Sequence, residues 1–247
     1  MSLSERDRIL AKIRYGKKGS KYAKENRNHG FTHNTTGQQD QTPENSEYEN
    51  ETLISEFEES CNKLPVKVLR AENIEQVHEC LSSILKEKGI KEAGLWDSGL
   101  ILSMEIESFL KHLGIRNVWK SGKGPSKREQ MKEYSKEIGQ AEVGITGADY
   151  GLADTGTLVL RSGSGQDRGS SLLPPVHITL LERSRILPGS DELISILTED
   201  TKHEGCMKSC ITLITGPSKT ADIELTLVRG VHGPGELFVI LLDFQPY

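Results

Sequence analysis

The chain has 247 residues and a mass of 27.4 kDa, the size of one large domain or of one domain with a tail. Its 31 Lys and Arg against 36 Asp and Glu give a net charge of −5, which excludes a surface built mainly for nucleic acid. The mean hydropathy is −0.47. The longest wholly apolar run, 237–242, is far shorter than the roughly 20 residues that a membrane-spanning helix needs. Because the first residues lack the apolar core of a signal peptide, we expect a cytoplasmic protein.

Charge divides the first 60 residues into two blocks. Residues 1–24 hold eight Lys and Arg against two Asp and Glu, and residues 25–60 hold one Arg against nine Asp and Glu. Apolar residues at positions 9, 10 and 13 predict one short amphipathic helix. From residue 16 onward apolar residues are too few to offset the entropy of ordering, so we predict a mobile polar arm that reaches residue 60, followed by one domain over 61–247. The basic block is either a solvated face or a contact for an acidic partner.

Short apolar runs and longer amphipathic segments alternate from residue 64 to residue 146. Strand, helix and strand at this spacing are typical of right-handed crossovers and of a mostly parallel sheet with helices on its faces. Glycine follows two of the predicted helices, as it does at many helix ends. The predicted elements are a strand over 65–69, a helix over 74–85, a strand over 93–96, a helix over 106–113, a strand over 117–119, a helix over 126–138 and a strand over 143–146.

The alternation of predicted strands and helices ends after residue 149. Two apolar runs, 156–160 and 176–181, are joined by a Gly- and Ser-rich connector that predicts either a hairpin-like pair or a loop crossing one end of the sheet. A helix over 191–198 and a strand over 211–215 follow, and the run 237–243 is apolar enough for a strand buried on both faces. The predicted fold is a three-layer α/β sandwich with a small inserted β element.

Three polar segments that contain glycine follow predicted strands, at 144–157, 215–222 and 230–235. Ligands of open α/β sheets bind beyond the carboxyl ends of the strands, so we expect these segments to meet in one pocket. In the second segment, Pro217 suits the first turn of a helix capped by Ser218 or Thr220, and such a helix start binds anions. A lining of hydroxyls, carboxylates and N–H groups favours a small carboxylate or phosphate. The alternative is ordinary turn chemistry in each segment.

Several familiar sites are missing from the sequence. It holds no G-x-G-x-x-G, P-loop or G-x-S-x-G motif. Cys206 and Cys210 have no second pair nearby, which favours reduced structural thiols over an iron–sulfur or zinc site. His177 lies within an apolar run and is predicted to be a hydrogen-bonded core histidine, whereas His232 lies between glycines and is a candidate for proton transfer.

Four blocks of the sequence resemble the LUD-domain proteins and, among them, the lactate utilization protein C family. The resemblance spans roughly residues 65–243, with the blocks in the family's order. They are GITGAD (144–149) with ADTGTLVL (153–160), SLLPPVHI (171–178), ITGPSKTADIE (214–224) and GVHGP (230–234).

The resemblance implies a fold similar to the NagB/RpiA/CoA-transferase-like superfamily and a part in the oxidation of L-lactate to pyruvate. It implies a complex subunit that has no cofactor or metal of its own and works beside iron–sulfur subunits. It establishes no catalytic residue. Our hypothesis assigns proton transfer to Asp154 and His232, and binding of a small carboxylate or other anion to Thr146, Thr155, Gly156, Thr157, Gly216, Ser218, Thr220 and Asp222. The alternatives are a stand-alone enzyme for a small phosphorylated or CoA-linked substrate, and a scaffolding or regulatory subunit.

Overall fold

The computed structural model describes residues 45–118, 139–163, 165–204, 210–221, 227–229 and 233–246. The chain forms two compact units. The smaller unit contributes one described helix, α9 (Ser190–Glu204), which is longer than the predicted 191–198. All other described elements belong to the larger unit. The helices predicted near residue 9 and over 126–138 lie outside the described residues.

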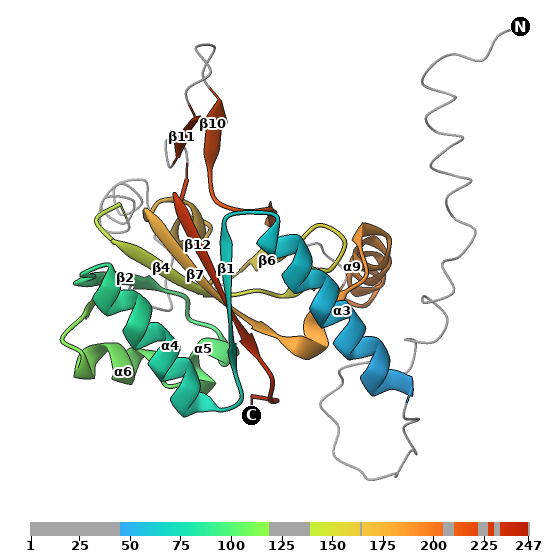
Figure 1. The fold of residues 1–247 in the computed structure, drawn as a ribbon, viewed down its shortest axis with the longest axis horizontal. Helices are drawn as coiled ribbons and strands as arrows, with labels where there is room; N and C mark the ends of the chain where they lie inside the picture. Colours follow the sequence, from blue (N-terminus) through green and yellow to red (C-terminus); the bar gives the residue numbers. More distant parts are fainter. Residues whose placement is uncertain are drawn as a thin grey trace, which may run out of the picture. The chain divides into compact units, whose positions relative to one another are not determined.

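A six-stranded parallel sheet forms the centre of the larger unit (Figure 1). Its strand order is β1-β12-β7-β4-β2-β3, and every neighbouring pair is parallel. Residues 237–242 are buried throughout, since their strand lies between two others and is covered on both faces. This confirms the predicted parallel sheet. The strands are β1 (Val66–Ala71), β2 (Glu92–Leu95), β3 (Arg116–Asn117), β4 (Val143–Gly147), β7 (Val176–Glu182) and β12 (Glu236–Leu242).

Helices α4 (Ile74–Glu87), α5 (Gly99–Ser103) and α6 (Ile106–His112) form the crossovers between the first three strands. Asn73 begins α4, because its side chain accepts a hydrogen bond from the N–H of Gln76 and satisfies a donor of the first turn. The buried stripe of α4 has the helical spacing seen in the sequence, and this stripe comprises Val77, Leu81, Ile84 and Leu85.

The opposite face of the large sheet carries the third layer. Lys67 and Arg70, three positions apart in β1, point to opposite faces and pair with Glu87 of α4 and Glu58 of α3 (Asn45–Asn62), respectively. The face of α3 also carries α8 (Gly169–Leu172) and a four-stranded sheet of order β8-β5-β6-β9. This sheet comprises β5 (Tyr150–Leu152), β6 (Thr157–Ser162), β8 (Ile186–Leu187) and β9 (Cys210–Ile214), and η2 (Arg183–Arg185) precedes β8. The three-layer α/β sandwich with an inserted β element is thus confirmed.

Helix α3 corrects the prediction that the polar arm extends to residue 60. The helix begins at Asn45 and fully buries the side chains of Ile54, Phe57 and Cys61. Their spacing of three and four residues is a helical stripe. The surrounding glutamates dominated the composition of this segment and concealed the stripe.

Of the two alternatives predicted for the connector between β6 and β7, the hairpin-like pair is wrong, because the two strands lie in different sheets. The connector contains α8. The segment after β9 does not start a helix. It forms β10 (Lys219–Ala221), which pairs antiparallel with β11 (Leu227–Arg229), because cross-strand pairing prevails over the capping signal of Pro217 and Ser218. No described helix combines the length and the apolar character that crossing a membrane requires.

Candidate functional site

The β5–β6 turn and the backbones around Ser218 and Gly233 lie at the amino ends of the central strands, not at the expected carboxyl ends. Strand β5 carries the chain back across the sheet, so the turn after it meets the end of α3, just before β1 begins. The N–H of Ser218 donates to the carbonyl of Pro234 at 2.8 Å, directly before β12. The N–H of Gly235 donates to Pro175, directly before β7, at 2.9 Å. Two of the three predicted segments therefore approach the same edge of the sheet through their backbones, and the turn of the first segment lies at that edge as well.

A chain of hydroxyl groups crosses the turn between β5 and β6. The Thr157 hydroxyl donates to Thr155 Oγ1 at 2.8 Å, and the Thr155 hydroxyl donates to Asp154 Oδ1 at 2.9 Å. Thr157 Oγ1 also lies 2.7 Å from Thr215 Oγ1. Since the Thr157 proton is directed to Thr155, Thr215 must donate to Thr157. The protons thus point in one direction, from Thr215 to the carboxylate of Asp154.

The backbone of this turn is held against the end of α3. Gly156 has a φ of +62°, and a Cβ placed on it would lie 2.9 Å from the backbone nitrogen of Cys61. The Ser60 hydroxyl donates to the carbonyl of Asp154 at 3.3 Å, and the N–H of Asp154 donates to Pro188 at 3.2 Å. Asp154 and Thr155 remain exposed, whereas Thr157 is buried. The turn therefore presents one carboxylate and one hydroxyl to solvent from a fixed backbone.

The second and third predicted segments meet at Ser218. A Cβ placed on Gly233 would lie 3.3 Å from the Cβ of Ser218, so the two backbones are in close contact. Ser218 is three residues from Thr215 of the hydroxyl chain, a reach of at most about 11 Å. His232, the neighbour of Gly233, lies outside the described residues, as does Asp222. Thr220 lies in β10, opposite Val228 of β11, and Gly216 lies beside Leu64.

Thr146 is not brought to the other predicted residues. It lies in β4 with no exposed surface, and its Oγ1 is 2.9 Å from Nε2 of the equally buried His177. The Thr146 hydroxyl donates to Thr179 Oγ1 at 3.2 Å, so the His177 Nε2–H must donate to Thr146. Burial lowers the pKa of His177 to about 3, which keeps the ring neutral. The prediction of a hydrogen-bonded core histidine is confirmed.

Cysteine chemistry at this edge is suppressed. Burial, with a smaller contribution from Glu58, raises the pKa of the Cys61 thiol to about 12, so the thiolate that a nucleophile needs is not formed at neutral pH. Cys210 is half-buried in β9 and is a free thiol. Within the described ranges, no group of three or more His, Cys, Asp or Glu is arranged to hold a metal ion.

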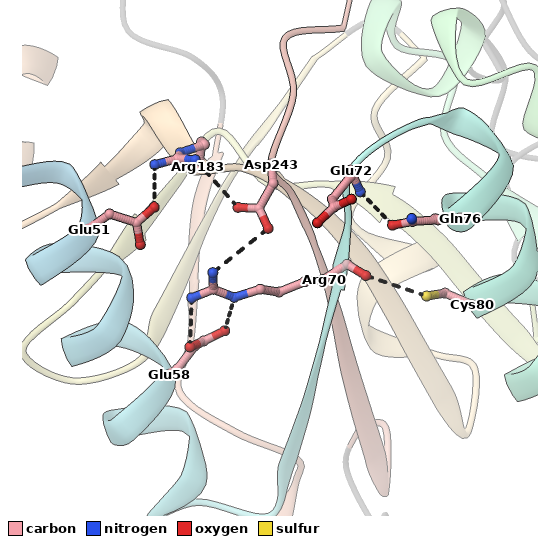
Figure 2. A network of polar contacts seen from close by, with 8 residues as sticks. All are labelled: Glu51, Glu58, Arg70, Glu72, Gln76, Cys80, Arg183 and Asp243. Atoms are coloured by element: carbon pink, nitrogen blue, oxygen red, sulfur yellow. Dashed lines mark hydrogen bonds and ion pairs between the residues drawn. The ribbon is translucent and has the colours of Figure 1, made fainter. Parts of the chain in front are cut away.

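The carboxyl ends of β1, β12 and β7 carry a network of ion pairs that the sequence analysis missed (Figure 2). Arg70 pairs with both carboxylate oxygens of Glu58, at 2.7 and 2.9 Å, and this hydrogen bonding raises the pKa of Arg70. Asp243 lies 3.8 Å from Arg70 and 3.9 Å from Arg183, and Arg183 pairs with Glu51 at 2.7 Å. The partners come from distant parts of the chain, so no local motif announces the network. This network therefore lies at the carboxyl ends of the strands, where the sequence analysis predicted the ligand-binding pocket.

The fold defines a three-layer α/β protein. One edge of its sheet carries a polar group of turn residues, which we call the turn cluster and which comprises Asp154, Thr155, Thr157, Thr215 and Ser218. Residues 54–242 match the LUD domain model, so the chain belongs to the LUD domain family. It is 32% identical to "Lactate utilization protein C" of Halalkalibacterium halodurans over 197 residues, which cover 80% of this chain and 82% of that protein. It is 36% identical to "Uncharacterized protein YkgG" of Escherichia coli over 162 residues, 62% of this chain and 65% of that protein.

A solved structure has the same fold. The DUF162 family protein from Deinococcus radiodurans superposes with a TM-score of 0.54 and covers 78% of this chain and 98% of its own. The sequence identity is 18%, so the likeness concerns the fold alone.

Proposed function

We propose that this chain is the component without iron–sulfur clusters of a cytosolic system that oxidises L-lactate to pyruvate. The observation that carries the proposal is the likeness to a protein named for lactate utilization, at 32% identity over about four fifths of both chains. Membership of the LUD domain family over residues 54–242 supports it. In this proposal the partners are the iron–sulfur subunits that accept the electrons.

The chemistry requires a group that accepts a proton. Oxidation of L-lactate to pyruvate removes one proton from the hydroxyl, one proton from C2 and two electrons, which in this proposal pass to the iron–sulfur partners. We assign the hydroxyl proton to Asp154, which is exposed and is oriented by its hydrogen bond from Thr155. His232 is assigned the second proton, on the basis of its place next to Gly233, which contacts Ser218.

The carboxylate of the substrate needs donors. In the proposal these are hydroxyls and backbone N–H groups of the turn cluster, since oriented neutral donors bind an anion without a cation. The proposed ligand-binding residues are Thr155, Gly156, Gly216, Ser218, Thr220 and Asp222. Thr146 and Thr157 are left out of this set, because both hydroxyls are buried and already engaged. The Thr146 hydroxyl is engaged by His177 and Thr179, and the Thr157 hydroxyl by Thr155 and Thr215.

The function is tested in the host organism. We expect that deletion of the gene abolishes growth on L-lactate, and that the tagged protein, purified without oxygen, brings down iron-containing chains that reduce an acceptor when L-lactate is added. Unchanged growth on L-lactate after deletion overturns the proposal. Turnover of a sugar phosphate or an acyl-CoA by the chain alone supports the stand-alone enzyme instead.

The assignment of Asp154 is tested by Asp154→Asn in the same purified assembly. Loss of a proton acceptor lowers lactate-dependent reduction by roughly 100-fold or more, while the iron-containing partners still co-purify. Asp191→Asn is the matched control, since Asp191 is also exposed and lies in α9. Equal activity of the two variants would remove Asp154 from the mechanism.

A further inference from the structure

A cavity of about 290 Å³ lies beyond the carboxyl end of β2, away from the turn cluster. Its lining includes Leu95 and Trp96 at the end of β2, and residues of α5 and α6. The carboxyl ends of parallel strands are where open α/β sheets bind their ligands. The volume is close to the lower end of the range of roughly 300–1,000 Å³ for small-molecule sites. We call it the β2 cavity.

The β2 cavity combines an apolar base with an acidic rim. Leu95 and Trp96 are almost completely buried and Ile106 is fully buried, so they form a closed apolar floor beneath the cavity. Leu102 also lines the cavity, yet 61% of its surface is exposed, which makes it one of the few large apolar side chains left open to solvent in the described chain. An apolar base next to an exposed leucine favours a ligand with a hydrocarbon part.

Among the described residues, every charged side chain that lines the cavity is acidic. Asp97, Glu105 and Glu107 line it, and within the part of the chain that the structure describes none of the three is in an ion pair. By contrast, the carboxylates at the carboxyl ends of β1, β12 and β7 are paired with arginines. A cleft lined by charges of one sign concentrates ions of the opposite sign.

Two hydrogen bonds link the walls of the cavity to neighbouring elements, and the backbone at Glu105 has an unusual conformation. Glu105 has a φ of +51°, the only positive value at a non-glycine residue in the described chain, and it joins α5 directly to α6. Glu107 accepts a hydrogen bond from Asn117 Nδ2 at 3.4 Å, which ties α6 to the end of β3. The indole N–H of Trp96 donates to the carbonyl of Asp167 at 2.8 Å, which fixes the aromatic wall.

From these observations we propose that the β2 cavity binds a small organic cation, an ammonium or guanidinium group on a short hydrocarbon chain. The carboxylates bind the charged group, and the exposed Leu102 contacts the hydrocarbon above the small open part of Trp96. L-lactate is an anion and is repelled by this rim. The β2 cavity is therefore a different site from the one proposed for lactate, and the two proposals are tested independently.

The test uses the full chain with Trp119→Phe, which leaves Trp96 as the single tryptophan. Titration with n-butylammonium is expected to change the indole signal of Trp96 saturably, and less so at high salt. Uncharged n-butanol and anionic butyrate, which have similar hydrocarbon parts, are expected to give no saturation in the same range. An equal response to n-butanol, or no saturable response to n-butylammonium, overturns the proposal.

The residues are tested by the double variant Glu105→Gln and Glu107→Gln. Both side chains are exposed, so the fold is retained, and affinity for n-butylammonium is expected to fall about tenfold or more, the scale of a lost charged hydrogen bond. Glu79→Gln, which changes an exposed carboxylate on α4, is the control and leaves the affinity unchanged.

Ser108→Phe, at another exposed lining position, is expected to block the cavity and so to weaken binding of n-butylammonium. Wild-type affinity in the double variant, measured beside an unchanged melting temperature, contradicts the assignment.

Discussion

His177 is completely buried within the six-stranded sheet, where its Nε2 lies 2.9 Å from the Thr146 hydroxyl. Its Nδ1 has no hydrogen-bond partner among the described residues. A second proton on this ring would place an uncompensated charge in the core, and this cost lowers the pKa of His177 from 6.5 to about 3. The consequence is a dependence of folding stability on pH.

Between pH 6.5 and pH 3 the unfolded chain protonates His177 while the folded chain does not. The unfolded state then binds more protons, so the free energy of unfolding decreases as the pH falls through this window, by about 2 kcal/mol at pH 5. Urea denaturation at pH 7 and pH 5 measures the loss. His177→Gln removes the titrating group and should reduce the loss by that amount.

His112→Gln is the control for this prediction. His112 is exposed on α6 and should leave the wild-type dependence on pH intact. If His177→Gln does not fold, the histidine NMR signals of the wild type decide the matter, because the His177 ring should remain neutral at pH 5. A protonated His177 ring in the folded protein at pH 5 would contradict the prediction.

At the scale of elements, the contact between the β5–β6 turn and the end of α3 positions the candidate site. Gly156 permits this contact in two ways, by its φ of +62° and by the absence of a Cβ next to Cys61. Gly114, after α6, has a similar φ of +72°, but a Cβ added there would meet no atom within 4 Å. Substitution of Gly114 therefore measures the cost of backbone strain alone, whereas substitution of Gly156 measures backbone strain together with the loss of close packing.

Gly114→Ala is expected to cost about 1 kcal/mol of unfolding free energy, from backbone conformation alone. Gly156→Ala should cost roughly 1–3 kcal/mol more, because the added methyl group forces α3 away from the turn. Chemical denaturation of both variants measures the difference. Equal costs would show that the turn does not need the close approach to α3.

At the scale of the whole molecule, α3 is part of the larger unit. Ile54 and Phe57 are fully buried in the core, and α3 is also tied to the sheet through Arg70 and Arg183. These ion pairs are partly exposed, so each contributes little stability, about 0–1 kcal/mol. The buried side chains are the larger contribution.

A chain that begins at residue 45 should unfold within a few degrees of the full-length protein in the transition of the larger unit. A chain that begins at residue 61 loses Ile54 and Phe57, each worth about 2–5 kcal/mol. At about 2–4 °C per kcal/mol for a domain of this size, its melting temperature should fall by roughly 10 °C or more. Calorimetry distinguishes the two. Equal melting temperatures would restore the predicted boundary at residue 61.

Elements with a strong local pattern were predictable from the sequence. The apolar residues of α4 recur with the helical period of 3.6 residues, so its buried face is visible in the sequence. Strands β7 and β12 are buried on both faces, and their continuous apolar runs show this directly. The turn residues of the candidate site were proposed from glycine-containing segments after predicted strands, which is a different signal from periodicity. Helix α3 and the β10–β11 pair were missed, because the stripe of α3 is hidden among glutamates and β10 is specified by its partner.

The class of fold, a parallel sheet between helical layers, follows from the sequence alone, and so do the residue types available in its turns. Only the tertiary structure decided at which edge those turns lie. Residues such as Cys61 and Gly156, or Arg183 and Glu51, meet across long stretches of chain. Such contacts depend on strand order and on the path of β5, which are set by global packing. Local periodicity holds no information about them.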